Sequence, residues 1–384
     1  MLSRRNLIVG AGIGTVCLAT RSLAASGDHG ASFVDRLAQE QISSGQCAGL
    51  AVGLKHKGQV ILSKGYGLAD VASKTLVTDR SVFRIASITK TFTAISIIQL
   101  KNAGKLKLDD RLSLYFPSFP RGHDVTLAQL LSHTAGIYDF VRGFPPGSSP
   151  HWTTADEFID RLLKVETLYD FDPGTHYSYS NSGYVLLGAI IEQVSGQPLE
   201  RYMAGHIFTP LGLTDTVIDH TGDKVDNRAI GYNLVGGQLS PAADDGMLPF
   251  SAGAIRSSLR DMMVWQTALW NGTLLPKADL ATMARPARLN DGQLADTSIW
   301  WPSGGPPGKP PAFITAHGYG FGLESTTAYG HLSIGHNGGI SGYNSIVARF
   351  PQDDVEVVML ANTDNGIVSP WFKLLEGVGN GKVG

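Results

Sequence analysis

The chain has few cysteines, no marked excess of one charge and no long apolar run. Two cysteines occur in 384 residues, and Cys17 lies in an N-terminal stretch with the features of a cleaved signal. Cys47 would then have no partner for an intrachain disulfide, and the fold must be held by packing. Lysine and arginine number 31 against 33 acidic residues, so nothing suggests nucleic acid as a partner. The 43% hydrophobic content is enough for a large core, in one domain or two closely joined ones.

Several motifs of metal-dependent and nucleotide-binding proteins are also missing. The chain has no H-E-x-x-H motif, no paired-cysteine spacing, no G-x-S-x-G nucleophile elbow and no Walker or dinucleotide-binding glycine loop. His317, His331 and His336 lie close together in the sequence, but none of these spacings accompanies them. We therefore expect no metal site.

The N-terminus has the composition of an export signal. Arg4 and Arg5 precede an apolar stretch from Leu7 to Thr20, and small residues end at Ala24, where cleavage is expected. The stretch is shorter than the roughly 20 residues that span a bilayer, so we expect no stable membrane anchor. The paired arginines resemble a twin-arginine signal. The sequence thus predicts a signal at residues 1–24, a single domain at residues 25–384, and a periplasmic or secreted protein.

Hydrophobic periodicity predicts strands at both ends of the chain and helices between them. Helices are predicted at residues 31–43, 88–101, 126–133, 154–165, 182–195, 198–207, 258–270 and 367–376. Strands are predicted at residues 50–54, 59–63, 319–324, 331–336, 343–350 and 355–361, and a proline- and glycine-rich surface loop at residues 302–311. The predicted fold class is α+β. An antiparallel sheet is formed from both chain ends (about 25–86 and 313–384) and flanked by helices, with a large, mostly helical lobe (about 87–312).

Ser87 and Lys90 lie three residues apart at the start of the most apolar predicted helix. Serine is a weak nucleophile that needs a base beside it, and residues three apart share one face of a helix. Because burial disfavours an ammonium group, we expect the pKa of Lys90 to fall and its neutral amine to accept the serine proton. The alternative is a serine that caps the helix and a lysine that reaches solvent. The spacing alone gives both interpretations even weight.

Tyr179-Ser180-Asn181 is a second motif, on a loop that enters a predicted helix. Loops of this kind often present functional side chains. Tyr179 could shuttle a proton to a leaving group, and Asn181 could both donate to and accept from a substrate amide. In isolation, however, a turn with Asn181 or Ser182 as helix N-cap is the better interpretation.

His336-Asn337-Gly338-Gly339 is the third motif, at the end of a predicted strand. The glycines could let a substrate backbone approach the strand edge, and His336 could hold a tyrosine hydroxyl. The N–H of Gly339 could join that of Ser87 in an oxyanion hole, where each donor is worth roughly 3 kcal/mol of barrier. Alone, a glycine bulge with an incidental histidine is the favoured interpretation.

In combination and in this order, the three motifs resemble those of the penicillin-binding serine hydrolases. Class C β-lactamases, soluble D-alanyl-D-alanine carboxypeptidases and related esterases are the most similar. Segments 59–67, 130–137 and 251–254 also look like parts of that family, so the resemblance covers nearly the whole mature chain. It implies no cofactor and the following site: nucleophile Ser87, base and proton relay Lys90, proton shuttle Tyr179, substrate-amide contact Asn181, third-motif residue His336, and strand-edge and oxyanion positions Gly338 and Gly339.

Two departures from the family pattern bear on the substrate. Class C β-lactamases have lysine where this chain has His336, and histidine there looks more like the carboxypeptidases and esterases. Family carboxypeptidases hold a C-terminal carboxylate with hydroxyl and arginine groups near this strand. Here Asn337 and Gly339 replace hydroxyl positions, and no arginine lies between residues 300 and 348.

The resulting hypothesis is an exported serine hydrolase with an acyl-enzyme on Ser87, acting most like a D-alanyl-D-alanine carboxypeptidase. An esterase or a class C-like β-lactamase on the same site is the alternative. The expected partners are small peptide, ester or β-lactam substrates, including the peptidoglycan stem peptide. A hypothesis of another class is a catalytically silent cell-wall-binding or sensor protein. Such proteins usually lose the serine or the lysine, and this chain has both.

Overall fold

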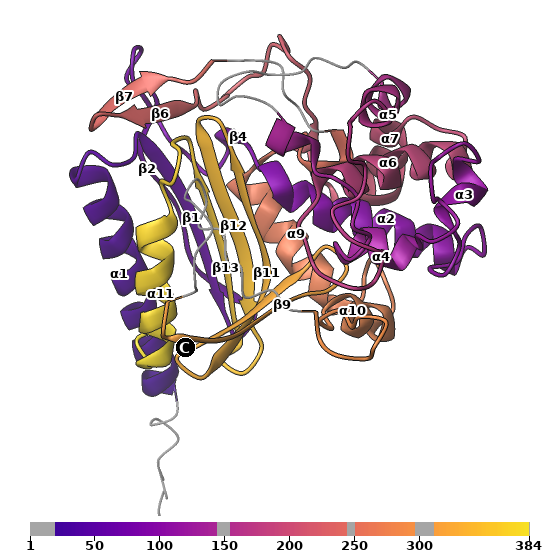
Figure 1. Cartoon of the computed structure of the whole chain (residues 1–384). Helices are drawn as coiled ribbons and strands as arrows, with labels where there is room; N and C mark the ends of the chain where they lie inside the picture. Colours follow the sequence, from indigo (N-terminus) through magenta and orange to yellow (C-terminus); the bar gives the residue numbers. More distant parts are fainter. Residues whose placement is uncertain (1–19, 144–153, 244–249, 296–310, 384) are drawn as a thin grey trace, which may run out of the picture.

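A large antiparallel sheet joins the two ends of the chain (Figure 1). The computed structural model describes residues 20–143, 154–243, 250–295 and 311–383. The sheet has eight strands in the order β3-β2-β1-β13-β12-β11-β10-β9. These are β1 (Gly49–His56), β2 (Gln59–Asp70), β3 (Thr75–Leu76), β9 (Ile314–Tyr319), β10 (Glu324–Ala328), β11 (His331–Ile340), β12 (Tyr343–Phe350) and β13 (Val355–Ala361). Since β1 pairs with β13, the predicted sheet from both chain ends is confirmed.

Helices cover both faces of this sheet, and most of them lie between β3 and β9 in the sequence. They are α1 (Thr20–Ser43), α2 (Thr89–Asn102), α3 (Leu112–Tyr115), α4 (Leu127–Leu131), α5 (Ala155–Leu162), α6 (Asn181–Ser195), α7 (Leu199–Met203), α8 (Thr209–Leu211), α9 (Leu259–Asn271), α10 (Lys277–Met283) and α11 (Val368–Gly379). Two small sheets accompany them, β4 (Val82–Arg84) with β8 (Ile255–Ser258) and β5 (Val217–Ile218), and β6 (Tyr232–Val235) with β7 (Gln238–Pro241).

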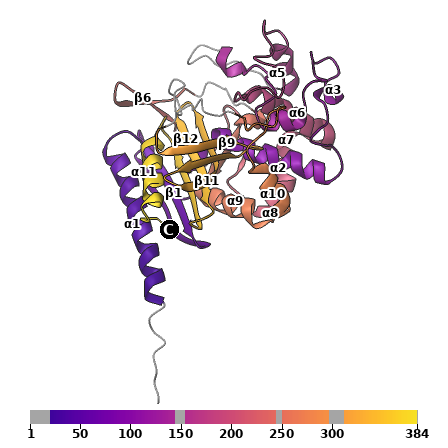
Figure 2. The same cartoon turned by 60° about the horizontal axis from the view of Figure 1, so that its bottom comes forward.

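The central strands bury side chains on both faces of the sheet. Side chains alternate between the faces along a strand. In β1, Leu50, Val52 and Leu54 join a core beneath α1 and α11, whereas Ala51 joins the larger core shared with the helical lobe. Helices α1 and α11 lie side by side in both orientations (Figures 1 and 2). The sheet is therefore a buried layer between two sets of helices.

Local signals explain where several helices begin and end. Helix α6 starts after Ser180, whose hydroxyl accepts the N–H of Gly183, and ends at Gly196, whose φ of +70° suits the left-handed C-cap. Thr126 and Gln129 form a reciprocal capping box at α4. Such caps satisfy backbone groups that the helix itself leaves without partners.

The predicted elements agree with the structure except in one strand. Strands β12 and β13 have the predicted bounds, and each predicted helix overlaps an observed one. The strand predicted at residues 319–324 is wrong, because these residues end β9 and form its connection to β10. Of the predicted signal, residues 1–19 lie outside the described residues, as does nearly all of the 302–311 loop; helix α1 begins at Thr20.

The wrong strand contains glycines that bring the β9–β10 connection against two helices. A Cβ on Gly320 would lie 2.0 Å from the carbonyl oxygen of Met283 in α10. Gly322 has a φ of +68°, and a Cβ there would lie 2.8 Å from the carbonyl oxygen of Lys90. Alternation of glycine with apolar residues therefore produces a tight connection here rather than a strand.

We predict that Gly320→Ala destabilises the fold by about 1–3 kcal/mol, because the neighbouring atoms belong to the backbone and cannot turn away as a side chain does. Urea unfolding followed by circular dichroism measures this difference. Gly205→Ala is the matched control, since a Cβ there meets nothing within 4 Å, and it should change stability by less than about 1 kcal/mol. Equal stability of the two variants would contradict the close approach.

Candidate active site

Ser87 lies on a turn of 3-10 helix, Ala86–Ile88, directly before α2. Its hydroxyl makes no capping hydrogen bond to either helix, so the interpretation of Ser87 as an N-cap is wrong. Ala86 has a φ of +47°, an uncommon conformation for a residue with a side chain. Residues held in such conformations are often found at functional sites. Ser87 is partly exposed and free to meet a substrate.

Lys90 is fully buried, and its amine lies 3.1 Å from the hydroxyl oxygen of Ser87. It also contacts two oxygens that can only accept, Asn181 Oδ1 and the carbonyl oxygen of Ala252, each at 2.8 Å. A neutral amine that donates to both of them directs its lone pair toward Ser87. Burial lowers the pKa of Lys90 to about 7, while Asp139 and Glu324 act in the opposite direction. The lysine thus does not reach solvent, and it has the position and basicity of a general base.

Tyr179 contacts the same pair. The amine of Lys90 lies 4.8 Å from the centre of its ring. Burial raises the pKa of Tyr179 well above its usual value, and the nearby hydroxyl of Ser87 opposes this rise. The phenol therefore keeps its proton at neutral pH. This favours Lys90 as the base and Tyr179 as a proton donor.

Asn181 is the first residue of α6 and does not cap it, because Ser180 does. Its backbone N–H donates to Asp139 Oδ1 at 3.0 Å, and its side-chain nitrogen lies 3.4 Å from both carboxylate oxygens of Asp139. The amide is thus oriented with its oxygen toward Lys90. Asp139 was not identified from the sequence, where it is one acidic residue among 33 and follows a loop of otherwise uncharged residues.

His336 lies on β11 and is 2% exposed. Its Nδ1 lies 2.5 Å from the carbonyl oxygen of Asn337, and its Nε2 lies 2.9 Å from the hydroxyl of Tyr319. Nδ1–H therefore donates to the carbonyl, and Nε2 accepts from the phenol. Burial, with Lys90 nearby, lowers the pKa of His336 to about 3. The imidazole is neutral at physiological pH, and the tyrosine hydroxyl that it holds is that of Tyr319.

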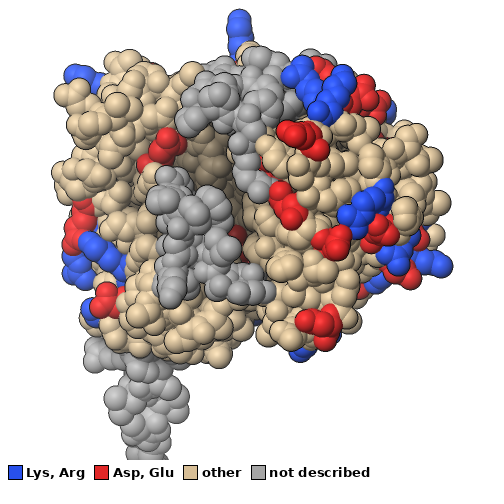
Figure 3. Space-filling view, viewed as in Figure 1, with Lys and Arg blue, Asp and Glu red and all other residues tan. Residues whose placement is uncertain are grey.

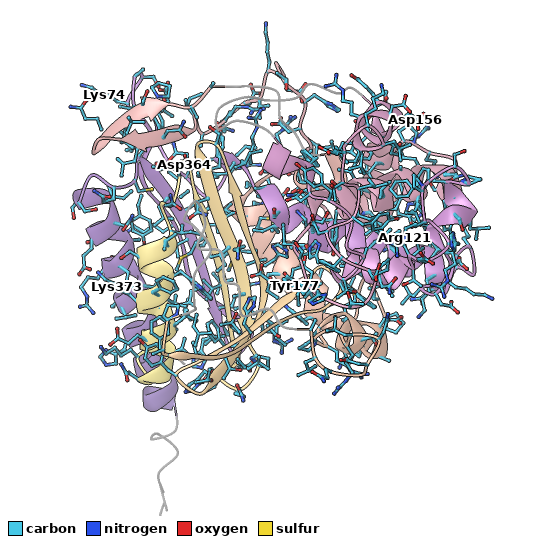
Figure 4. The ribbon with its side chains drawn as sticks, viewed as in Figure 1. Lys74, Arg121, Asp156, Tyr177, Asp364 and Lys373 are labelled. Carbon is cyan, nitrogen blue, oxygen red and sulfur yellow. The ribbon has the colours of Figure 1, made fainter. Side chains whose placement is uncertain are left out.

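A buried histidine, His133, completes an aromatic cluster around this site. Its ring centre lies 4.3 Å from that of Tyr179 and 4.5 Å from that of Tyr319, and its Nδ1 accepts the N–H of Ser180. Burial lowers the pKa of His133 well below its usual value. Tyr177 borders the cluster where the end of β9 approaches the helical lobe (Figure 4). The cluster surrounds Lys90 with aromatic rings and keeps its amine from water.

The two glycines of the third motif differ in their surroundings. Gly338 is buried, and a Cβ there would lie 2.3 Å from the carbonyl oxygen of Ile85, so only glycine lets β11 approach the nucleophile turn this closely. Gly339 is exposed at the strand edge. In the described part of the chain, the pairing of β11 with β10 ends at Gly335, which leaves the edge beyond it open to a substrate. The strand continues without a bulge to Ile340.

The described residues contain no group of three or more histidine, cysteine, aspartate or glutamate side chains that could hold a metal ion. Of the histidines that lie close together in the sequence, His331 pairs with Asp353 at 2.9 Å, whereas His336 faces Tyr319. Cys47 is a buried thiol. No helix within the described ranges is long and apolar enough to cross a membrane.

The face of the molecule seen in Figure 3 is hollowed between the sheet half and the helical half. Side chains of both charges gather mainly toward the margins of this face rather than in the hollow. The outer helical lobe carries paired surface charges such as Arg121 with Asp124 and Asp172. The part of this face that is not covered by undescribed residues therefore shows no continuous patch of one sign.

Comparison with known proteins places these features in a family. A family model described as Beta-lactamase matches residues 34–370. The chain is 27% identical over 323 residues to penicillin-binding protein 4* of Bacillus subtilis (strain 168), covering 80% of this chain and 66% of that protein. It is 27% identical over 341 residues to protein flp of Staphylococcus aureus (strain N315), covering 87% and 64%. The chain thus spans about two thirds or less of the length of these curated relatives.

Solved structures with the same fold include two enzymes or enzyme homologues of similar size. D-amino acid amidase from Ochrobactrum anthropi SV3, complexed with L-phenylalanine, has a TM-score of 0.75 and 26% identity, covering 91% of this chain and 98% of its own. The octameric penicillin-binding protein homologue from Pyrococcus abyssi has a TM-score of 0.72 and 27% identity, covering 94% and 78%. The predicted α+β fold class is thus confirmed.

We predict that Lys90→Met slows acylation of Ser87 by about 100- to 10,000-fold, the usual contribution of a general base. In the wild type, acylation should rise as the pH increases through about 7, because the amine must be neutral to accept a proton. Labelling by a fluorophosphonate, followed by intact mass, measures both effects. Lys55→Met, at a second buried lysine, whose amine donates to the carbonyl oxygen of Met263 in α9, is the control and should label like the wild type. Equal labelling of the Lys90 variant would remove Lys90 as the base.

Proposed function

The chain belongs to the Beta-lactamase family of serine hydrolases, and on that premise we propose that it is an exported hydrolase that cleaves amide bonds of D-configured substrates through an acyl-enzyme on Ser87. The observation that carries this proposal is the contact between the buried amine of Lys90 and the hydroxyl of Ser87, at 3.1 Å. A serine hydroxyl without such a neighbour is a weak nucleophile.

In the first half of the reaction, the neutral amine of Lys90 takes the proton of Ser87. The serine oxygen then attacks the substrate carbonyl carbon, and a tetrahedral intermediate forms with a negative charge on the carbonyl oxygen. The N–H groups of Ser87 and Gly339 are the proposed donors to that oxygen. Gly338 supports this arrangement, because it lets β11 approach the segment that precedes the nucleophile. Asn181, oriented by Asp139, is available to bind an amide of the acyl group.

Tyr179 is the proposed donor to the leaving group. Its phenol lies beside Ser87 and Lys90, within reach of the nitrogen that departs from the scissile bond. The phenol gives its proton to that nitrogen as the C–N bond breaks, and the ammonium of Lys90 returns a proton to the phenol. A water molecule then attacks the serine ester by the reverse sequence, and Ser87 regains its proton.

The surroundings of the strand edge favour a leaving group without a carboxylate. Asn337, at a position where a carboxypeptidase is expected to offer a hydroxyl, donates its side chain to Glu324 at 2.9 Å and is not available to a substrate. Gly339 has no side chain, and no arginine lies between residues 300 and 348. The acidic side chains of Asp139 and Glu324 also act on this site and would repel an anion. Amides of D-amino acids, as in the name of the Ochrobactrum anthropi enzyme, meet these conditions.

A D-alanyl-D-alanine carboxypeptidase is the second candidate, because the chain resembles penicillin-binding protein 4* over 80% of its length. Such an enzyme would act on the peptidoglycan stem peptide outside the cytoplasm. Export is supported by the arginine pair and apolar stretch at the N-terminus. Fractionation of cells that express the full chain, compared with a variant in which Arg4 and Arg5 are replaced by lysine, tests it; cytoplasmic wild-type protein would contradict export.

We predict that a D-Ala-D-Ala peptide with an amidated C-terminus is hydrolysed with a kcat/KM at least about tenfold above that of the same peptide with a free carboxylate, a difference of about 1.4 kcal/mol. D-amino acid amides should be hydrolysed as well. Release of ammonia or of the terminal residue, followed by chromatography, measures each rate. Ser87→Ala should abolish hydrolysis of every substrate without changing the circular dichroism spectrum.

A preference for the free carboxylate would instead establish the carboxypeptidase. Absence of any hydrolysis, combined with binding of peptidoglycan and no adduct with a fluorophosphonate, would favour the silent binding protein. A covalent adduct that forms with penicillin and is then lost would show that the protein hydrolyses β-lactams.

A further inference from the structure

Glu324 is a half-buried carboxylate beside the site with no role in the reaction described above. It is the first residue of β10, opposite Gly335 of β11. Its Oε2 accepts a hydrogen bond from the side-chain nitrogen of Asn337 at 2.9 Å. It also borders a cavity of about 70 Å³ between β9–β11 and helix α11. The polar lining of this cavity includes His317, His336, Asn337, Asn344 and Ser345 besides Glu324, and α11 contributes Val368, Trp371, Phe372 and Leu375.

Asn337 links Glu324 to the strand edge at which substrate is expected. Its carbonyl oxygen accepts from Nδ1 of His336, and the next residue is Gly338, which contacts the nucleophile turn. On the other side of the sheet, its side chain is held by the carboxylate. Both the backbone and the side chain of Asn337 are therefore fixed. Loss of the hydrogen bond from Asn337 to Glu324 would free the segment that carries Gly339.

The segment that leads into Glu324 also packs against Lys90, since a Cβ on Gly322 would lie 2.8 Å from the carbonyl oxygen of Lys90. Burial raises the pKa of Glu324 to about 7, and the amine of Lys90 and the hydrogen bond from Asn337 oppose this rise. Burial lowers the pKa of Lys90 to about 7, and Asp139 and Glu324 oppose this fall. An opposite charge stabilises the ionised form of its neighbour. Glu324 is thus one of two carboxylates whose charge raises the pKa of Lys90, against the effect of burial.

Burial moves the pKa of five titratable groups around the pair away from neutral pH. Tyr177, Tyr179 and Tyr319 face Glu324, and burial raises the pKa of each well above its usual value. His133 and His336 face Lys90, and burial lowers the pKa of both. The ring of Tyr184 also lies 5.5 Å from the amine, and His317 faces Glu324 across the cavity. The part of α11 that lines the cavity carries no charge.

We propose that Glu324 is a positioning residue of this site: its carboxylate fixes the strand edge through the amide of Asn337, and its negative charge favours the protonated amine of Lys90. The inference rests on the proposed function, since it assumes that Lys90 is the base. It assigns two separable effects to one side chain, a hydrogen bond and a charge. Substitutions that remove one without the other distinguish them.

Glu324→Gln removes the charge and keeps an oxygen that can accept from Asn337. Without the carboxylate, the ammonium of Lys90 is less stable, so the amine becomes neutral at lower pH. The acid limb of the pH profile of kcat/KM should move to lower pH by roughly one unit. This is the lower end of the pKa shift that a neighbouring opposite charge causes. Asn337→Ala removes the hydrogen bond and keeps the charge. It should lower the rate at the high-pH plateau and move the acid limb by less than Glu324→Gln does.

The profiles are measured with the fastest amide substrate and, independently, as the rate of fluorophosphonate labelling. Glu356→Gln, on β13 beside Thr267, is the matched control and should leave the acid limb unmoved. An unmoved limb in Glu324→Gln, or the same loss of rate at every pH, would overturn the proposal. Should Glu324→Gln fail to fold, Glu324→Asp keeps the charge and must keep the wild-type limb. A displaced limb in that variant would equally overturn it.

Failure of the proposed function is recognised separately: in that case the fluorophosphonate would label Lys90→Met as fast as the wild type.

Discussion

The uncharged amine of Lys90 against the hydroxyl of Ser87 is the interaction on which the site depends, and its cause is desolvation. Removing an ammonium group from water is costly unless it is paired, so a buried lysine becomes a weaker base and loses its proton more easily. The structure gives this amine only uncharged direct partners, among them Asn181 Oδ1 and the carbonyl oxygen of Ala252. Aromatic rings occupy the remaining surroundings, including those of Tyr179 and Tyr184. A lysine in water would be protonated at neutral pH and unable to take a proton from serine.

The fold supplies this environment by bringing together parts of the chain that are distant in sequence. Ser87 and Lys90 come from the start of α2, Asn181 from the start of α6, and His336 from β11. The sheet makes the last of these possible, because the strands of the C-terminal part pair with β1 of the N-terminal part. Close contact between the layers then depends on residues without side chains. Gly338 is the clearest case, since any Cβ would strike the backbone at Ile85.

Much of the fold was predictable from the sequence, and the exceptions have a physical cause. Strands β12 and β13 alternate or continue in apolar residues between clear turns, so their bounds were predicted. The predicted strand at residues 319–324 has the same alternation, but its glycines adopt a conformation and a contact that a strand does not require. Periodicity records which residues are apolar and not which backbone angles they adopt. Hence it predicted the sheet and misplaced the connection between Tyr319, which ends β9, and Glu324, which begins β10.

The candidate site was predictable only in part, for a related reason. Motif order and spacing brought Ser87, Lys90 and Tyr179 into consideration, and the structure places them in contact. Asp139 and Glu324 have no such signal, because one carboxylate in a sequence looks like any other until burial and partners are known. Their importance lies in what surrounds them, and this is a property of the folded chain.

The placement of these two carboxylates explains a feature of the site that no single motif conveys. A site that must hold a neutral amine has reason to exclude anions, since an anion beside Lys90 would stabilise the ammonium form and return the proton to the base. Asp139 and Glu324 already have that influence, but both are fixed in hydrogen bonds to amides, Asn181 and Asn337. A substrate carboxylate bound near the strand edge would add a third negative charge. It would raise the pKa of Lys90 further and meet repulsion from the other two. Within the described residues, the strand edge offers no group to bind such a carboxylate, and this agrees with the presence of two acids that would repel it. These acids oppose the burial that keeps the amine of Lys90 uncharged, so a further negative charge beside it would weaken the base.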